Sequence, residues 1–330
     1  MKTRPIIIGF AALAAVIVLG APFVGMTAIS PSDLLQPASD SAEAVVFWRI
    51  RVPRVLAAFL AGSGLALSGM AFQALFRNPL ATPFTLGVSG GAAFGAALYM
   101  RLGLSFALLG ISGSSLSAFA GACGVILLVY GLTRIRGGFT TPTLLLAGVA
   151  LSFFLSSMIL ALQYSASLHD SFRLVRWLMG GLGMVGYDAP LNLFPIVVTG
   201  AVILFMLRNE LNLLILGEDI AMSRGLDVPR VKRRLFFAVS LMVGGIVSVC
   251  GPIGFVGMMI PHICRLLVGS DHRHLYPATL LFGGAFLTLC DVISRTAFAP
   301  AEIPVGVITA LIGGPFFLYL LLRRGSSQLF

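Results

Sequence analysis

Long apolar runs separated by short polar connections dominate this chain. About 20 apolar residues suffice to cross the hydrocarbon core of a bilayer, and ten runs match or approach that length. They cover residues 6–29, 53–74, 84–101, 113–132, 142–164, 190–207, 235–251, 253–268, 276–297 and 304–322. The third and eighth runs are short and rich in glycine. The pattern predicts an all-α polytopic membrane protein with about ten transmembrane helices, in a single domain over residues 1–330.

The composition excludes a soluble fold. Of the 330 residues, 58% are hydrophobic and only 10% are charged, whereas a soluble domain carries roughly a quarter of charged residues. The first run follows Lys2 and Arg4, as a signal peptide would, but it is longer than the apolar region of a signal peptide. We therefore interpret it as a membrane span.

The net charge of +10 indicates how the helices are oriented in the membrane and does not indicate nucleic-acid binding. A nucleic-acid binder gathers basic residues on a solvated face, whereas most arginines here stand at the ends of apolar runs. Placing both chain ends in the cytoplasm puts most of the 22 basic residues on that side, in agreement with the positive-inside rule. The basic residues left outside are Arg49, Arg51, Arg54, Arg101, Arg173, Arg176 and Arg295.

Glycine and proline mark packing and breaks within the spans. Many of the 38 glycines lie inside apolar runs, where small residues let helix backbones approach closely. Tight packing is one interpretation, and the smooth wall of a wide pathway is the other. Pro252, between two glycine-rich runs, indicates a re-entrant turn.

The sequence contains no machinery for nucleotide hydrolysis. Neither lysine lies in the Gly-x-x-x-x-Gly-Lys-Ser/Thr loop that cradles phosphates, so we expect no catalytic residue. Active transport would need an ion gradient or a separate ATPase. Carriers driven by gradients bury ionisable residues at mid-membrane, but Asp291, the clearest candidate, stands four residues before Arg295 and favours a local ion pair.

The longest basic connection contains a predicted surface helix. The segment has acidic residues near its start, Arg224 near its end and Gly225 directly after Arg224. This order is typical of a short capped helix. Such a helix is either simply solvated or is the rigid element that a soluble motor grips.

Seven motifs along nearly the whole chain resemble the FecCD-type permeases of bacterial ABC importers, which serve iron–siderophore, haem and cobalamin uptake. The motifs are Arg51-Val-Pro-Arg54, Gly69 to Gln73 leading to Arg77-Asn-Pro-Leu-Ala81-x-Pro83, Leu86 to Ala92, Leu145 to Val149, Gly217-Glu218-x-x-Ala221-x-x-x-Gly225, Gly251 to Gly257 with Pro261-His262, and Glu302-Ile-Pro-Val-Gly306. Each motif is weak alone, but seven in order at compatible spacing are specific.

The resemblance implies a type II ABC importer permease in a bacterial inner membrane. It further implies a homodimer around a central path, two cytoplasmic ATPase subunits that use the ATP, and a periplasmic substrate-binding protein docked outside. Besides these partners we expect contact with membrane lipid, no nucleic acid, and no cofactor bound by this chain. Which cargo is carried, and whether the partner permease is a second copy or a paralogue, stays open.

The resemblance also implies roles for particular residues. Gly217, Glu218, Ala221 and Gly225 belong to a coupling helix near 217–228 that contacts the ATPase. The cytoplasmic gate comprises Asn78, Pro79, Leu80, Thr140 and Thr141. Arg51, Arg54 and Arg295 match arginines that meet acidic residues of the binding protein, and exposed guanidinium groups on the outer face suit carboxylates. Anchoring in lipid headgroups is the alternative for these arginines.

Histidines and cysteines provide no convincing metal site. Four cysteines are scattered singly, without Cys-x-x-Cys spacing. His262, His272 and His274 lie near the end of the eighth span, but we expect His272 and His274 in a solvated loop. His169, before Arg173, Arg176 and Trp177, is the better candidate for contact with cargo.

The function that we predict is a permease subunit that takes up an iron–siderophore, haem or cobalamin by alternating access. A gradient-driven secondary transporter is the first alternative, and a membrane-embedded metalloenzyme using the histidines is the second. Few acidic residues lie in the spans, which disfavours the carrier, and the histidines are spread apart, which disfavours the enzyme.

Overall fold

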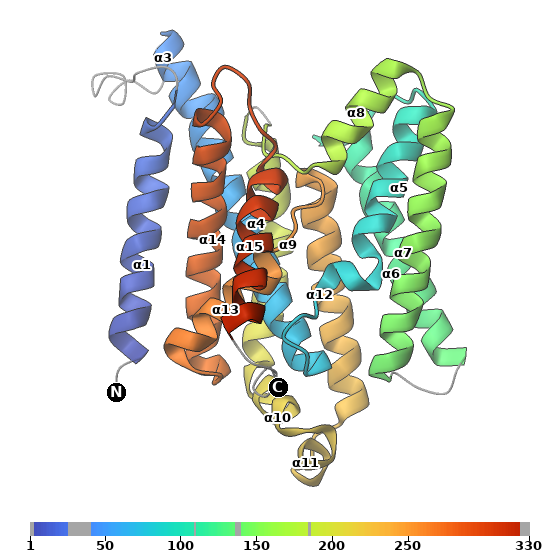
Figure 1. Ribbon diagram of the computed structural model, residues 1–330, viewed down its shortest axis with the longest axis vertical. Helices are drawn as coiled ribbons and strands as arrows, with labels where there is room; N and C mark the ends of the chain where they lie inside the picture. Colours follow the sequence, from blue (N-terminus) through green and yellow to red (C-terminus); the bar gives the residue numbers. More distant parts are fainter. Residues whose placement is uncertain (1–2, 26–40, 109, 136–139, 184–185, 324–330) are drawn as a thin grey trace.

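The protein is a bundle of helices in a computed structural model that describes residues 3–25, 41–108, 110–135, 140–183 and 186–323 (Figure 1). Its helical elements are α1 (Thr3–Gly20), η1 (Ala21–Phe23), α3 (Ala42–Val45), η2 (Val46–Arg51), α4 (Val52–Phe76), η3 (Pro83–Leu86), α5 (Val88–Arg101), α6 (Gly113–Ile135), α7 (Thr141–Tyr164), α8 (Leu168–Leu178), α9 (Asp188–Met206), α10 (Arg208–Leu216), α11 (Glu218–Ser223), α12 (Val228–Cys250), α13 (Val256–Val268), α14 (His272–Thr296) and α15 (Val305–Arg323). A small antiparallel hairpin pairs β1 (Ala107–Leu108) with β2 (Ile111–Ser112).

The all-α membrane fold is confirmed. Within the described residues, seven helical stretches are long and apolar enough to cross a membrane: Thr3–Phe23, Ala42–Phe76, Gly113–Arg134, Thr141–Tyr164, Asp188–Met206, Val228–Cys250 and His272–Thr296. The other three predicted spans coincide with α5, α13 and α15, which are not among these seven stretches, so the number of crossings stays a prediction. The end of the first predicted span, residues 26–29, lies outside the described residues.

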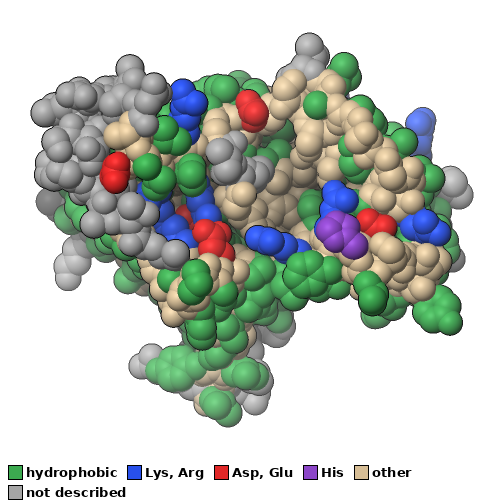
Figure 2. Space-filling view, turned by 90° about the horizontal axis from the view of Figure 1, so that it is seen from above, with side chains coloured by type: hydrophobic (Ala, Val, Ile, Leu, Met, Phe, Trp, Pro, Cys, Tyr) green, Lys and Arg blue, Asp and Glu red, His purple; other side chains and the backbone are tan. Residues whose placement is uncertain are grey.

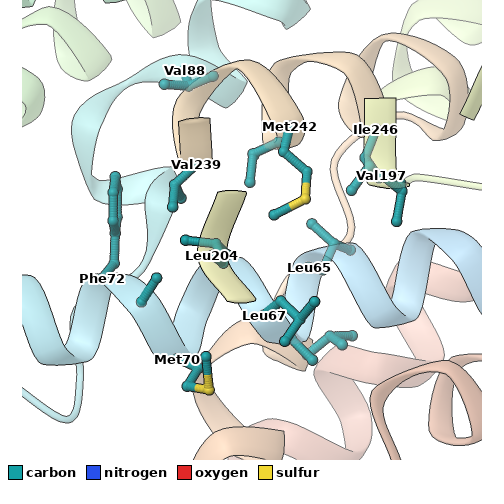
Figure 3. Packing of buried hydrophobic residues seen from close by; sticks show 14 of the residues in the cluster. Leu65, Leu67, Met70, Phe72, Val88, Val197, Leu204, Val239, Met242 and Ile246 are labelled. Carbon is teal, nitrogen blue, oxygen red and sulfur yellow. The ribbon is translucent and has the colours of Figure 1, made fainter. Parts of the chain in front are cut away.

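Helix α4 is the central element of the bundle, because nearly all of its length is buried. Its side chains Leu65, Leu67, Met70 and Phe72 belong to one buried cluster with residues of α9 and α12 (Figure 3). Such all-round burial explains why α4 shows no polar face. By contrast, α1 and α7 expose most of their apolar side chains, as helices that face lipid or a second subunit do.

Close approach of helices explains several of the glycines. A Cβ added at Gly62 would collide with the backbone of Gly283, and one added at Gly69 would collide with the backbone of Gly257. These contacts join α4 to α14 and to α13. At these positions tight packing is the reason for glycine, as the first interpretation predicts.

The two ends of the bundle differ in structure. The start of α1 and the end of α15 lie at the end that also carries α10 and α11, whereas η2 and α8 lie at the opposite end (Figure 1). The sequence pattern did not predict α8 or α10. For α8 a signal was present, since the hydroxyl of Ser167 caps the helix by accepting from the backbone N–H of Asp170.

Helix α12 ends just before Pro252, where the sequence predicts a re-entrant turn. Residues 251–255 have no helical structure before α13 begins, and Gly251 takes a φ of 68°. A Cβ there would meet the backbone oxygen of Trp177, so both the backbone angle and the close approach require glycine.

Candidate functional site at the two ends of the bundle

Helix α11 contains the residues of the predicted coupling helix. The helix spans residues 218–223, shorter than the predicted 217–228, because a turn separates it from α12. Gly217 begins it with a φ of 123° and Gly225 follows it with a φ of 81°, angles that favour glycine. Ala221 is fully buried, its N–H donates to the Gly217 carbonyl at 2.9 Å, and its own carbonyl accepts from the Leu226 N–H at 3.1 Å.

An ion pair joins α11 to α12. The Nζ atom of Lys232 lies 2.5 Å from Oε1 of Glu218, and the lysine side chain is only 5% exposed against 44% for the glutamate. The two residues are 14 positions apart and come together only because the turn folds α11 back against α12. Periodicity within one helix therefore could not reveal this pair.

The predicted gate threonines lie beside the coupling helix. A cavity of about 380 Å³ separates the start of α7 from α11 and α12. It is lined by Thr140, Thr141, Pro142, Glu218, Met222, Val228, Pro229 and Lys232. The structure thus brings two of the predicted sets of residues to one place.

The other predicted gate segment forms a turn that follows the end of α4 in the chain. The backbone N–H of Leu80 donates to the side-chain oxygen of Asn78 at 2.9 Å, with Pro79 between them, and the Leu80 side chain is 55% exposed. The turn follows Arg77, which ends α4 with a φ of 48°. An Arg77 nitrogen lies 3.3 Å from where a Cβ at Gly217 would stand, so this segment adjoins the start of α11.

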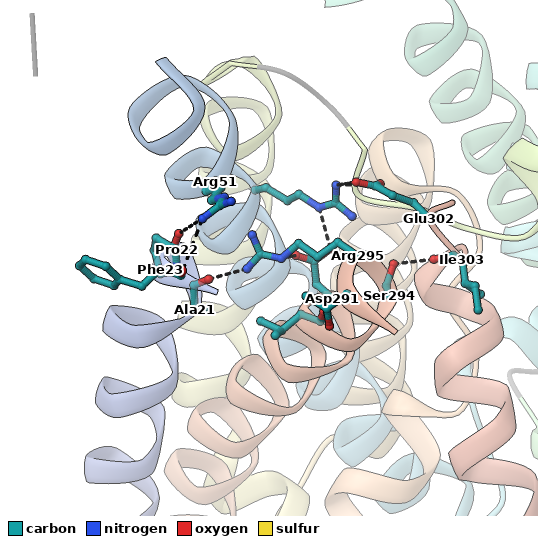
Figure 4. Close-up of polar contacts among 12 residues, drawn as sticks. Ala21, Pro22, Phe23, Arg51, Asp291, Ser294, Arg295, Glu302 and Ile303 are labelled. Carbon is teal, nitrogen blue, oxygen red and sulfur yellow. Dashed lines mark hydrogen bonds and ion pairs between the residues drawn. The ribbon is translucent and has the colours of Figure 1, made fainter. Parts of the chain in front are cut away.

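At the opposite end, Arg54 lies in a network of mostly buried charges that includes Asp291 and Glu302, both labelled in Figure 4. Its Nε lies 2.7 Å from Oδ1 of Asp291, and its Nη1 lies 2.9 Å from Oε2 of Glu302. Asp291 is fully buried and also faces Arg295 at 3.7 Å. The local pair between Asp291 and Arg295 is confirmed, but Arg54 is the closer partner.

The expectation that Arg51, Arg54 and Arg295 are exposed is wrong. Their side chains are 5%, 6% and 6% exposed. Arg51 donates to the carbonyl of Pro22, and Arg295 donates to that of Ala21 (Figure 4). Carbonyls at the end of a helix have spare acceptor capacity, and these two arginines donate to it. The sequence places the arginines at helix ends but does not show that α1 ends beside them.

These arginines nevertheless reach a small cavity of about 150 Å³. Its lining is Gly25, Val46, Ile50, Arg51, Arg54, Arg295 and Glu302. Glu302, 43% exposed, is the most accessible charged member of the Arg54 network.

A larger cavity of about 350 Å³ lies next to the Arg54 network, between α8 and the start of α15. Its lining combines charged, aromatic and glycine residues: Arg54, Met100, Arg173, Arg176, Trp177, Gly181, Leu182, Gly183, Val249, Cys250, Gly251, Ser294, Glu302, Ile303, Pro304 and Val305. Figure 2 looks onto this end and shows basic, acidic and histidine side chains scattered over a hollowed surface.

The histidines form no site with one another in the described part of the chain, where no group of three or more His, Cys, Asp and Glu side chains could hold a metal. The prediction that His272 lies in a solvated loop is wrong: it is 1% exposed and its ring nitrogen lies 2.8 Å from the side-chain oxygen of Asn212. His274 is half-buried, and His169 is exposed near the start of α8 and does not line the larger cavity.

Comparison with known proteins identifies a common family. The model of the FecCD transport family matches residues 12–323. The chain is 35% identical over 317 residues to the hemin transport system permease protein HmuU of Yersinia pestis, covering 96% of this chain and 95% of the relative. It is 40% identical over 304 residues to the vitamin B12 import system permease protein BtuC of Escherichia coli, covering 90% and 88%.

Two further comparisons also match ABC transporter proteins. The chain is 40% identical over 287 residues to the ABC transporter permease protein YvrB of Bacillus subtilis, covering 86% of this chain and 81% of the relative. A solved structure described as an inward-facing conformation of a metal-chelate type ABC transporter superposes with a TM-score of 0.87 at 33% identity, over 97% of this chain and all of the other. Both overlaps extend over nearly the whole bundle.

Proposed function

Because this chain belongs to the FecCD transport family and is a permease subunit of an ABC importer, we propose that two copies of it enclose a central path. Two cytoplasmic ATPase subunits and one outer binding protein complete the assembly. The chain is a multi-pass protein of the bacterial inner membrane. Its cargo is a large metal chelate such as an iron–siderophore, haem or cobalamin, the class for which relatives are named, and it moves by alternating access.

The observation that carries this proposal is the way in which α11 is held. The helix projects beyond the bundle (Figure 1), where one ion pair to α12 and one backbone hydrogen bond in the turn that follows hold it. At one end Glu218 pairs with Lys232, and at the other the Leu226 N–H donates to the Ala221 carbonyl. A helix held at two points transmits a push from an ATPase to α12 instead of swinging freely.

Helix α12 extends this connection through the membrane. It begins at Val228, one turn before Lys232, and ends at Cys250, and most of its length is buried against α4, α6 and α9. At its far end the Cys250 carbonyl accepts from the Gly181 N–H at 2.8 Å, in the lining of the larger outer cavity. A shift of α11 would therefore reach the outer cavity through one packed helix.

The gate that we propose lies at the same end as α11. Thr140 and Thr141 share a cavity with Glu218 and Lys232, and the turn at Asn78 to Leu80 follows Arg77, which adjoins Gly217. Movement of α11 would change both segments directly. In the dimer, this arrangement would couple ATP binding to opening of the cytoplasmic end.

For the outer end we propose docking of the binding protein around the Arg54 network. The small cavity lined by Arg51, Arg54 and Arg295 would accept an acidic side chain. Because all three arginines are buried, they are poorly placed to anchor lipid headgroups by extending outward. His169 on the exposed side of α8 would contribute at the rim.

The ATPase is the first element of the proposal to test. We expect the purified permease to hydrolyse no ATP by itself, because it lacks a phosphate-binding loop. Adding its ATPase partner should produce hydrolysis that rises further with loaded binding protein. Phosphate release in lipid nanodiscs measures both, and hydrolysis by the isolated chain, free of contaminants, would contradict the proposal.

The ion pair between α11 and α12 gives a second prediction. Lys232→Glu sets two carboxylates against each other, and Glu218→Lys sets two ammonium groups together. A partly exposed pair contributes about 1 kcal/mol or less, and each reversal adds repulsion between like charges, so we expect each single variant to reduce uptake about fivefold or more. Uptake of radiolabelled iron chelate by proteoliposomes holding the assembled transporter is the measurement.

The double variant Glu218→Lys/Lys232→Glu is the matched control. It reverses the pair without removing it, so we expect it to recover most of the uptake lost by either single variant. Arg230→Glu tests charge at an exposed position near the start of α12 and should have little effect. A well-folded double variant that stays as inactive as the singles would show that the pair does not hold α11 in place.

A further inference from the structure

We propose that the larger outer cavity binds an anionic group of the cargo, with Arg173 and Arg176 as the charged contacts and Trp177 as an apolar platform. The inference rests on the proposed import of a metal chelate and adds a preference for chelates with negative charge. It assigns to this chain a cargo contact of its own, separate from recognition by the binding protein.

The floor of the cavity is made of non-helical backbone inside a helical membrane protein. Residues 179–183, 251–255 and 297–304 are segments without helical structure, and each contributes to the lining or to its support. Non-helical backbone at membrane depth is tolerated where it is buried in protein or lines a polar cavity. In transporters, helix breaks of this kind mark binding sites.

Direct hydrogen bonds tie residues 179–183 to the end of α12 and to the start of α15, the helix ends next to the other two segments. The Gly181 N–H donates to the Cys250 carbonyl at 2.8 Å, and the Gly306 N–H donates to the Gly180 carbonyl at 3.3 Å. A Cβ added at Gly180, whose φ is 67°, would collide with the carbonyl of Pro252. The floor is therefore a defined structure rather than a gap left between helices.

The charges that the cavity offers to a ligand are positive. Arg54 and Glu302 both line the cavity, but they form an ion pair with each other. Arg54 also forms an ion pair with Asp291, which does not line the cavity. Within the described part of the chain, no acidic side chain forms an ion pair with Arg173 or Arg176. Both of these side chains are exposed, so they are available to a carboxylate, catecholate or phosphate group.

Helix α8 positions these residues together. Arg173 and Arg176 are three residues apart and so lie close together on one side of the helix. Leu174, on another side, is 4% exposed and packs α8 against its neighbours. Trp177 is half-buried against the core and, with Met100, supplies apolar surface in the same cavity. Positive charge beside an aromatic face suits an anionic chelate with a flat ligand shell.

Tryptophan fluorescence gives a direct test. The chain has two tryptophans, so in a Trp48→Phe background the intrinsic fluorescence of the permease comes from Trp177 alone. We would place the transporter, with its ATPase subunits carrying no tryptophan and without binding protein, in nanodiscs of zwitterionic lipid. A ferric tris-catecholate chelate, which is trianionic, is then compared with a neutral ferric trihydroxamate chelate of similar size.

We expect the anionic chelate to quench Trp177 with saturation and with an affinity that weakens as salt rises. The double variant Arg173→Gln/Arg176→Gln should weaken this binding at least tenfold and leave binding of the neutral chelate unchanged. Arg101→Gln is the matched control, since Arg101 is an exposed arginine at the outer end of α5 that does not line the cavity. It should bind the anionic chelate as the parent does.

Equal affinities for the two chelates, or an unchanged affinity in the double variant, would overturn the inference. If the arginine variant instead slows association of the binding protein while chelate binding is unaffected, the anion belongs to that protein and the inference also fails. Uptake assays separate this failure from failure of the proposed function. A complete transporter that imports a chelate without dependence on these arginines retains the function and refutes only the cavity's role.

Discussion

We expect the Ala221→Pro variant to lose uptake almost completely while the membrane bundle stays folded. Proline at this position removes the N–H that donates to the Gly217 carbonyl at 2.9 Å, and its ring collides with that carbonyl. Proline inside a helix costs about 3 kcal/mol, which the six-residue helix α11 cannot offset from its few other bonds. Uptake by proteoliposomes and ATP hydrolysis by the assembled transporter measure the effect.

The variant should also separate hydrolysis from transport. ATPase activity should no longer respond to loaded binding protein, because the helix that transmits the response is broken. Ala221→Ser is the matched control: it keeps the backbone N–H and differs from alanine by one oxygen, so most uptake should remain. Normal transport by a folded Ala221→Pro variant would remove α11 from the mechanism.

The second large effect concerns the buried carboxylate of Asp291. Asp291→Ala leaves Arg54 and Arg295, both 6% exposed, without their fully buried counter-charge. Breaking a buried ion pair from one side destabilises a protein by roughly 3–5 kcal/mol, because the remaining charge stays desolvated. We expect a marked fall in the thermal transition of the detergent-purified permease, with poor yield from the membrane.

Glu302→Ala provides the matched control on the same arginine. Glu302 forms an ion pair with Arg54 at 2.9 Å, but the Glu302 side chain is 43% exposed. Partly exposed pairs contribute about 1 kcal/mol or less, so this variant should unfold close to the parent's temperature. If the two variants proved equally stable, the Arg54 network would not be the element that joins α4 to α14 at this end.

The membrane fold and the family were accessible from the amino-acid pattern alone. Apolar runs about as long as a bilayer is thick leave little choice of structure, since every backbone polar group in lipid must bond within its own helix. The short third and eighth runs correspond to α5 and α13, and the turn predicted at Pro252 lies between α12 and α13. These features depend on local chain chemistry, so no tertiary contact was needed to infer them.

Features that depend on which helices are neighbours were decided only by the tertiary structure. Arg54 and Asp291 are 237 residues apart, and no periodicity predicts that they meet. Two of the arginines expected to be exposed, Arg51 and Arg295, are buried beside η1, where they donate to the carbonyls of Pro22 and Ala21. Likewise, Lys232 meets Glu218 only through the turn after α11. A residue's type and its place along a helix follow from local sequence, but its exposure and partners depend on packing between distant segments, and the candidate sites of this protein are built from such contacts.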